Sequence, residues 1–94
     1  MTPEGAVKNE VKKLLKEYDV YYHMPVQNGM GAPTLDFVGC CNGLYFAVET
    51  KAPGKKPTPR QEVTITSMRK SGAAVFVIDG ALTKLRWWLD SVSV

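Results

Sequence analysis

Two acidic residues and a lysine, Asp36, Glu49 and Lys51, are of the types that can support metal-dependent hydrolysis, and their spacing could bring them together. Asp36 lies in one apolar segment and the other two lie in the next, and the Asn-Gly pair at residues 42–43 between them predicts a β-hairpin. Side chains alternate faces along a strand, so Glu49 and Lys51 share a face and Thr50 points away. Carboxylates are ligands that Mg²⁺ prefers, and a lysine beside the metal ion can help water to attack a phosphodiester.

A Glu-x-Lys pair on a strand is more often a solvated ion pair, worth about 0–1 kcal/mol. The preceding residues 44–48 are all apolar, which is typical of a central strand. A charged pair at the end of a buried strand is costly unless it has a use. The apolar segment before Glu49 therefore favours a functional site over a solvated ion pair.

The chain of 94 residues is expected to form a single domain, residues 1–94. Hydrophobic spacing and turn signals predict seven elements: a helix over about 3–18, strands over 20–26, 35–40 and 44–51, a helix over about 59–71, a strand over 73–78, and a short helix over about 82–89. This α-β-β-β-α-β-α order predicts an α/β fold with a mixed four-stranded sheet and helices packed on it.

The first predicted helix has a clear apolar face. Glu4 lies inside the apolar arc and Glu10 lies at its edge. The lysines of this helix are expected mostly to face water: Lys8, Lys12, Lys13 and Lys16.

The order Asp36, Glu49-Thr50-Lys51 and then Gln61 after a short basic loop resembles the PD-(D/E)xK nuclease superfamily. The wider string is similar to the VRR-NUC (virus-type replication-repair nuclease) domain, especially its short stand-alone phage and bacterial forms. The matching segments span about residues 4–79: a helix glutamate, Gln27-Asn28-Gly29, Leu35-Asp36-Phe37, Gly43, Phe46-x-x-Glu49-Thr50-Lys51-Ala52, Pro59-x-Gln61 and Ser71-Gly72. The family's Pro-Asp is Leu35-Asp36 here, and proline binds no metal, so Asp36 keeps its expected role.

The resemblance implies a restriction-endonuclease-like fold and a metal-dependent deoxyribonuclease. Asp36 and Glu49 would bind Mg²⁺ or Mn²⁺ together with the carbonyl oxygen of Thr50. Lys51 would orient or deprotonate the attacking water and stabilise charge on the phosphate.

Two further site residues are implied by the same resemblance. Glu4 matches the family's helix glutamate, with Glu10 as the alternative, although a glutamate in a first helical turn is routinely a cap or dipole residue. Gln61 matches the family's glutamine beside the catalytic lysine or the scissile phosphate. It could also be an ordinary polar residue of a helix start.

The expected partner is DNA. Lys55, Lys56 and Arg60 form a basic loop that would bind flanking phosphates, and Gln27 and Asn28 could touch the backbone or a base. The formal charge of +3 is compatible with a polyanionic partner. The resemblance to small VRR-NUC proteins implies a homodimer and structure-selective cleavage of branched DNA such as Holliday junctions.

Other residues have simpler interpretations. Cys40 and Cys41 are expected to be reduced, because adjacent cysteines rarely bridge. His23 is more typical of packing than of metal binding, and Trp87 and Trp88 are expected in the core or an interface. No signal-peptide pattern occurs at the N-terminus, so a cytoplasmic location in a bacterial or phage-infected cell is expected.

Two functions from other classes compete with the nuclease. One is a nucleic-acid-binding module that has lost catalysis, against which the intact acids and lysine argue. The other is a small structural or adaptor domain, in which Glu49 and Lys51 are a chance ion pair.

Overall fold

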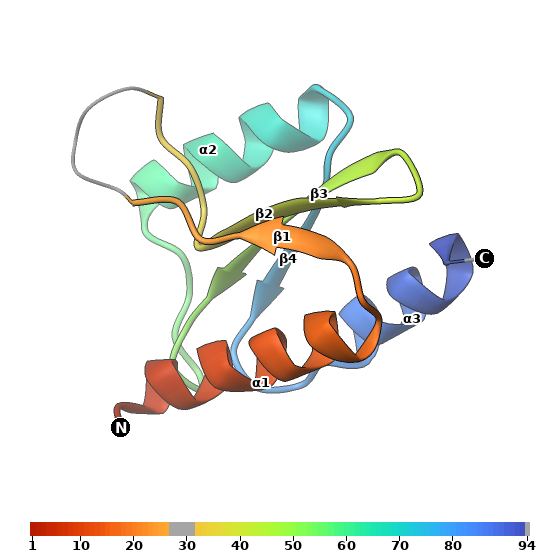
Figure 1. The fold of residues 1–94 in the computed structure, drawn as a ribbon. Coiled ribbons are helices and arrows are strands. Elements are labelled where there is room, and N and C mark those ends of the chain that lie inside the picture. Colours follow the sequence, from red (N-terminus) through yellow and green to blue (C-terminus); the bar gives the residue numbers. More distant parts are fainter. Residues whose placement is uncertain (27–31, 94) are drawn as a thin grey trace.

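The computed structural model describes residues 1–26 and 32–93 (Figure 1). Over these residues the chain forms the following elements: α1 Pro3–Glu17, β1 Tyr21–His23, β2 Phe37–Cys41, β3 Leu44–Thr50, α2 Pro59–Lys70, β4 Ala74–Ile78 and α3 Thr83–Val92. The strands lie in the order β1-β2-β3-β4. The first three are antiparallel neighbours, and β4 is parallel to β3. The predicted α/β class, element order and mixed four-stranded sheet are confirmed.

The helices form layers on both sides of this sheet. Figure 1 shows α1 and α3 below the sheet and α2 above it. The larger core cluster lies between the sheet and the helices α1 and α3: Val7, Val11, Leu14, Leu15, Phe37, Cys41, Phe46, Val48, Ile78, Leu85 and Leu89. The smaller cluster lies under α2: Leu35, Val38, Ala47, Ile65 and Val75. The central strand β3 is therefore covered on both faces, as its apolar sequence predicts.

The hairpin between β2 and β3 forms at the predicted turn. Asn42 and Gly43 both have positive φ angles, 52° and 82°. A tight turn of this kind needs two residues that tolerate the left-handed region, and Asn-Gly is the favoured pair. The turn fixes the register, so that Phe37 pairs with Val48.

Both long helices begin at a threonine cap followed by proline, as predicted. The Thr2 side chain accepts a hydrogen bond from the Gly5 backbone N–H at 2.9 Å. At α2, Thr58 and Gln61 form a reciprocal capping box, with bonds of 3.2 and 2.9 Å. These caps set where each helix starts relative to the sheet.

The first strand is shorter than predicted. β1 covers Tyr21–His23 instead of residues 20–26. The Val20 N–H closes the end of α1 by donating to the Leu15 carbonyl, and Pro25 has no N–H to donate to a sheet. Both ends of the predicted strand are therefore lost for backbone reasons.

The two tryptophans have different environments. Trp88 packs against Phe46 and Phe76, with ring centroids 5.6 Å apart in each pair. Trp87, in contrast, is 71% exposed. The expectation of core or interface positions is thus confirmed for Trp88 as a core residue, and the interface role of Trp87 stays a prediction.

Both cysteines are free thiols, with Cys40 exposed and Cys41 buried. Within the part of the chain that the structure describes, no helix has the length and apolar character needed to cross a membrane.

Candidate active site

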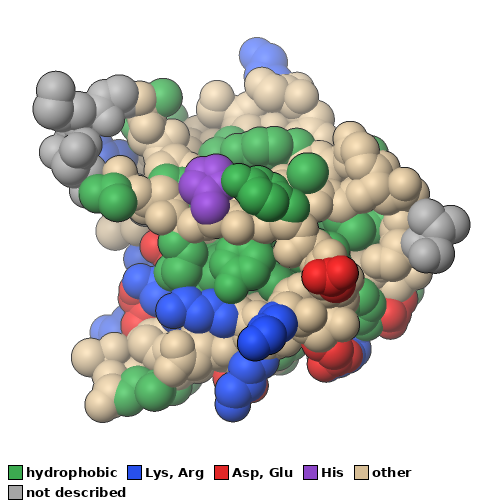
Figure 2. Space-filling view, viewed as in Figure 1, with side chains coloured by type: hydrophobic (Ala, Val, Ile, Leu, Met, Phe, Trp, Pro, Cys, Tyr) green, Lys and Arg blue, Asp and Glu red, His purple; other side chains and the backbone are tan. Residues whose placement is uncertain are grey.

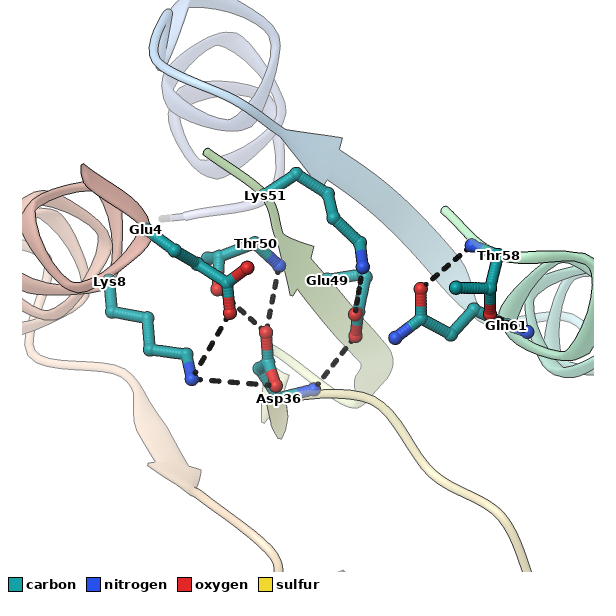
Figure 3. Close-up of polar contacts among 8 residues, drawn as sticks. All are labelled: Glu4, Lys8, Asp36, Glu49, Thr50, Lys51, Thr58 and Gln61. Atoms are coloured by element: carbon teal, nitrogen blue, oxygen red, sulfur yellow. Dashed lines mark hydrogen bonds and ion pairs between the residues drawn. The ribbon is translucent and has the colours of Figure 1, made fainter. Parts of the chain in front are cut away.

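The hairpin brings the predicted acids together at one end of the sheet (Figure 3). Asp36 directly precedes β2, and Glu49 and Thr50 end β3. Because Phe37 pairs with Val48, Asp36 comes opposite Glu49. The backbone N–H of Lys51 donates to the Ile78 carbonyl at 2.9 Å, which ties the end of β3 to β4.

Hydrogen bonds hold both carboxylates in place. The Asp36 Oδ2 atom accepts from the backbone N–H of Thr50 at 3.0 Å and from its hydroxyl at 2.6 Å. The Glu49 Oε1 atom accepts from the backbone N–H of Asp36 at 3.3 Å. Thr50 points away from Glu49 as predicted, but its fully buried hydroxyl has a role that the sequence did not indicate. One oxygen of each carboxylate is therefore fixed, and the other is free for a ligand.

Each free oxygen faces a lysine at a distance longer than a hydrogen bond. The Lys51 Nζ atom lies 3.8 Å from Glu49 Oε2. The Lys8 Nζ atom lies 3.9 Å from Asp36 Oδ1 and 3.6 Å from Glu4 Oε2. Three carboxyl groups and two ammonium groups thus share the site.

The electrostatic balance is unfavourable for the ionised Glu49. Burial, together with the nearby Asp36 and Glu4 charges, raises the pKa of Glu49 from its ordinary value of 4.5 to about 7. Lys51 and the Asp36 N–H act in the opposite direction, without cancelling the rise. A further cation at this site would stabilise the ionised carboxylate.

Glu4 and Glu10 are clearly distinguished by the structure. Glu4 contributes to the site through Lys8, whereas Glu10 pairs with Lys13 at 3.8 Å on the exposed side of α1. Of the two candidates, the structure brings Glu4 to the clustered acids and leaves Glu10 on the exposed side of the helix. The helical wheel placed Glu10 only at the edge of the apolar arc, and that edge is exposed.

Lys8 is the site residue that the sequence interpretation missed. It was expected to face water, yet its side chain is only 32% exposed and it contacts Asp36. The expectation is confirmed for Lys12, Lys13 and Lys16, which are exposed. It fails for Lys8 because the first turns of α1 lie over the end of β3, which a helical wheel cannot reveal. The spacing of Glu4 and Lys8, four residues apart, was the available signal.

Gln61 lies near the site but is engaged in its helix cap. Its Oε1 atom accepts the Thr58 backbone N–H at 2.9 Å. Figure 3 shows its side-chain nitrogen turned toward Glu49 and Lys51. One side chain can thus serve both the cap and the site.

The predicted DNA-binding residues lie on the surface or outside the described residues. Lys55, Lys56 and Arg60 are exposed, in the loop that follows β3 and at the start of α2. Gln27 and Asn28 lie outside the residues that the structure describes. Figure 2 shows the single histidine at the surface beside apolar side chains, with lysine and arginine side chains over α1 below it.

The donor set fits a hard divalent cation with few protein ligands. Among residues 1–26 and 32–93, no three His, Cys, Asp or Glu side chains are grouped closely enough to hold a metal ion. Asp36 and Glu49 offer two anionic oxygens without hydrogen bonds, Oδ1 and Oε2. Mg²⁺ usually takes one or two carboxylates and keeps several waters, so this pair is sufficient.

The shape of the surface alone would not identify this site. A cavity of about 510 Å³ lies along β4 and the start of α3, with Arg69, Phe76 and Lys84 in its lining. It contains none of the clustered acids. The chemistry of the side chains, rather than cavity size, therefore identifies the candidate site.

The chain matches no protein-family model, and comparison with curated proteins finds no significant match.

Proposed function

We propose that this protein is a metal-dependent nuclease that hydrolyses phosphodiester bonds in DNA. The observation that carries the proposal is the convergence of Asp36, Glu49 and Lys51, with Glu49 buried and its pKa raised to about 7. Buried carboxylates are usually paired with a cationic side chain or bound to a metal ion, and here Lys51 does not offset the rise in the pKa of Glu49. The order and spacing of the same residues also resemble VRR-NUC domains.

Asp36 and Glu49 would hold Mg²⁺ or Mn²⁺ through the two oxygens that lack hydrogen bonds, and the Thr50 carbonyl would add a third ligand. When bound, the metal would polarise the phosphate and favour formation of the nucleophile from water. Thr50 holds Asp36 in place through its N–H and hydroxyl. Pre-oriented ligands of this kind lower the cost of assembling the reactive geometry.

Lys51 would hold the attacking water and stabilise the charge that develops on the phosphate. Its ammonium group lies beside Glu49, and its side chain is only 13% exposed. A buried point charge acts more strongly on an anionic transition state than a solvated one. The Gln61 side-chain nitrogen, on the side of Glu49, is in position to donate to the same phosphate or water (Figure 3).

The substrate class we propose is branched DNA such as a Holliday junction, cut by a homodimer in the cytoplasm. Lys55, Lys56 and Arg60 are exposed and follow the β3 end of the site, where they would bind flanking phosphates. The exposed Trp87 provides an apolar anchor for a second copy. Two-fold symmetry would present two sites to strands of opposite polarity.

The direct test incubates the purified chain with four-way, forked and linear DNA in Mg²⁺, in Mn²⁺ or in EDTA. Metal-dependent cutting that is lost in Asp36→Asn is expected, and Lys13→Met is the matched control on the exposed side of α1. DNA binding in EDTA without cutting in any metal would replace the nuclease with a binding module. Absence of both would leave a structural or adaptor domain.

The dimer has its own test. Light scattering at micromolar concentration is expected to give twice the chain mass for the wild type and a monomer for Trp87→Ala. Paired nicks at symmetric positions on a junction should follow from the dimer. A monomeric wild type with unpaired nicks would remove the resolvase-like substrate and leave the metal-dependent nuclease intact.

A further inference from the structure

Lys8 and Lys13 lie on the same helix and each pairs with a glutamate, but their surroundings differ. Lys13 is 76% exposed and forms its ion pair with Glu10, at 3.8 Å. Lys8 is 32% exposed and lies between Glu4, at 3.6 Å, and Asp36, at 3.9 Å. Figure 3 shows its ammonium group reaching both carboxylates. Lys8 therefore links α1 to the candidate metal ligands.

The contact with Asp36 involves one particular oxygen. Oδ2 is already taken by the N–H and hydroxyl of Thr50, and Lys8 faces Oδ1. Oδ1 is also the oxygen left for a metal ion. A divalent cation on Oδ1 would repel an ammonium group held beside the same oxygen. Lys51 beside Glu49 Oε2 would meet a similar repulsion, but Lys8 also contacts a second carboxylate, Glu4, to which it can move.

We propose that Lys8 is a displaceable cation of this site, which neutralises Asp36 when no metal is bound and moves away when the metal enters. This inference rests on the metal site of the proposed function. Glu4 is the second residue of this mechanism, because it lies one helical turn before Lys8 and would hold the ammonium group after it leaves Asp36. Glu4 is thereby a positioning residue that acts through Lys8, rather than a metal ligand.

The charge of Lys8 is expected to lower the affinity of the site for a metal ion. Lys8 stabilises the metal-free protein and must give up one of its two carboxylates when the cation binds. Removing its charge should therefore tighten metal binding, whereas removing an ordinary supporting residue weakens it. An increase in metal affinity on removing Lys8 therefore indicates a displaceable cation, and a decrease indicates a supporting residue.

The test is calorimetric titration of the full chain with Mn²⁺ alone, without DNA. Lys8→Met is expected to bind Mn²⁺ about tenfold more tightly than the wild type, and Lys8→Arg, which keeps the charge, to stay close to it. Lys13→Met is the matched control and should leave the affinity unchanged. Lys8→Gln serves as a second neutral variant should Lys8→Met fail to fold.

Glu4 provides a second, independent readout. Glu4→Gln should weaken Mn²⁺ binding in the wild-type background, because Lys8 then remains on Asp36. In the Lys8→Met background the same substitution should have little effect. Equal weakening in both backgrounds would overturn the role of Glu4 as the acceptor of Lys8.

The outcomes separate this inference from the proposed function. Tighter Mn²⁺ binding by Lys8→Met supports it, even where the wild type cuts no DNA. Unchanged or weaker binding in the neutral Lys8 variants overturns it, and metal-dependent cutting by the wild type would then leave the nuclease standing. Failure of the wild type and every Lys8 variant to bind Mn²⁺ overturns both.

Discussion

The two ends of α1 both carry ion pairs, but the pairs are of different kinds. At the C-terminal end, the Arg86 guanidinium donates to Glu17 at 2.7 and 3.5 Å and lies 5.9 Å from the centre of the Tyr18 ring. The Tyr18 hydroxyl donates to Asp90. At the N-terminal end, the contacts of Lys8 with Glu4 and Asp36 are 3.6 and 3.9 Å long.

The difference lies in how completely the protein satisfies its own charges. The Glu17–Arg86 pair is exposed to water and is joined by direct hydrogen bonds. The N-terminal cluster has ion pairs of 3.6–3.9 Å and a buried Glu49. Glu17 raises the pKa of Arg86, which keeps that charge in place, whereas burial raises the pKa of Glu49, which opposes its charge. The exposed Glu17–Arg86 pair is thus satisfied by its own groups, whereas the N-terminal cluster contains a buried carboxylate whose ionisation is opposed, as expected if the proposed function is correct.

The largest effect is expected from removing either proposed metal ligand. Asp36→Asn or Glu49→Gln should reduce metal-dependent DNA cleavage by at least about 100-fold, because each substitution removes an anionic ligand and leaves the hairpin in place. Single-turnover cleavage with Mn²⁺ measures the loss. Wild-type rates in either variant would show that the N-terminal cluster is as inert as the C-terminal one.

The next largest effect concerns Lys51, which has a matched control in the same segment. Lys51→Ala is expected to lower the single-turnover rate by about 10²–10⁴-fold with little change in DNA affinity, since its proposed action is in the transition state. Lys55→Ala, in the exposed loop, should weaken DNA binding with little change in rate at saturation. A Lys51→Ala enzyme that loses only affinity would make Lys51 a phosphate clamp.

The sequence was a good guide to the hairpin, for a physical reason. Strand periodicity and the Asn-Gly turn are local, and together they determine that Asp36 lies opposite Glu49. The capped starts of α1 and α2 are local as well. The fold class followed from these elements and the rules that connect them.

The surroundings of Lys8, the two tryptophans and Thr50 depend on tertiary packing, which local sequence patterns do not determine. Lys8 looked solvated because a helical wheel records an average direction, and only packing shows that the first turns of α1 cover the site. Trp87 and Trp88 looked equivalent, yet only Trp88 meets Phe46 and Phe76. The hydrogen bond from Thr50 to Asp36 is likewise not predictable from the sequence, because it depends on where two strand ends meet.

A smaller effect, on stability, follows from the raised pKa of Glu49. Below about pH 4.5 Glu49 is protonated in both the folded and unfolded states, so it does not affect stability. Between 4.5 and about 7 only the unfolded state ionises, so folding stability falls as the pH rises, and above this window the loss is constant. The full loss is about 3 kcal/mol.

Glu49→Gln removes this titration. In EDTA, the variant should be more stable than the wild type at pH 8 and close to it at pH 4, as measured by urea unfolding at both pH values. The difference between the two proteins isolates Glu49 from the other titrating groups. A constant difference across the pH range would show that the site tolerates an ionised Glu49 without a metal.

The smallest effect is expected at the other end of α1. Arg86→Ala removes both hydrogen bonds to Glu17, but these groups are exposed and water replaces the lost contacts. The melting temperature should fall by no more than a few degrees, and the rate of DNA cleavage and the affinity for Mn²⁺ should not change. Lys8→Met, at the N-terminal end, should alter Mn²⁺ affinity in the same assays. If Arg86→Ala changed Mn²⁺ affinity as much as Lys8→Met does, the two ends of α1 would be coupled. The distinction between the Glu17–Arg86 pair and the proposed cation site would then be wrong.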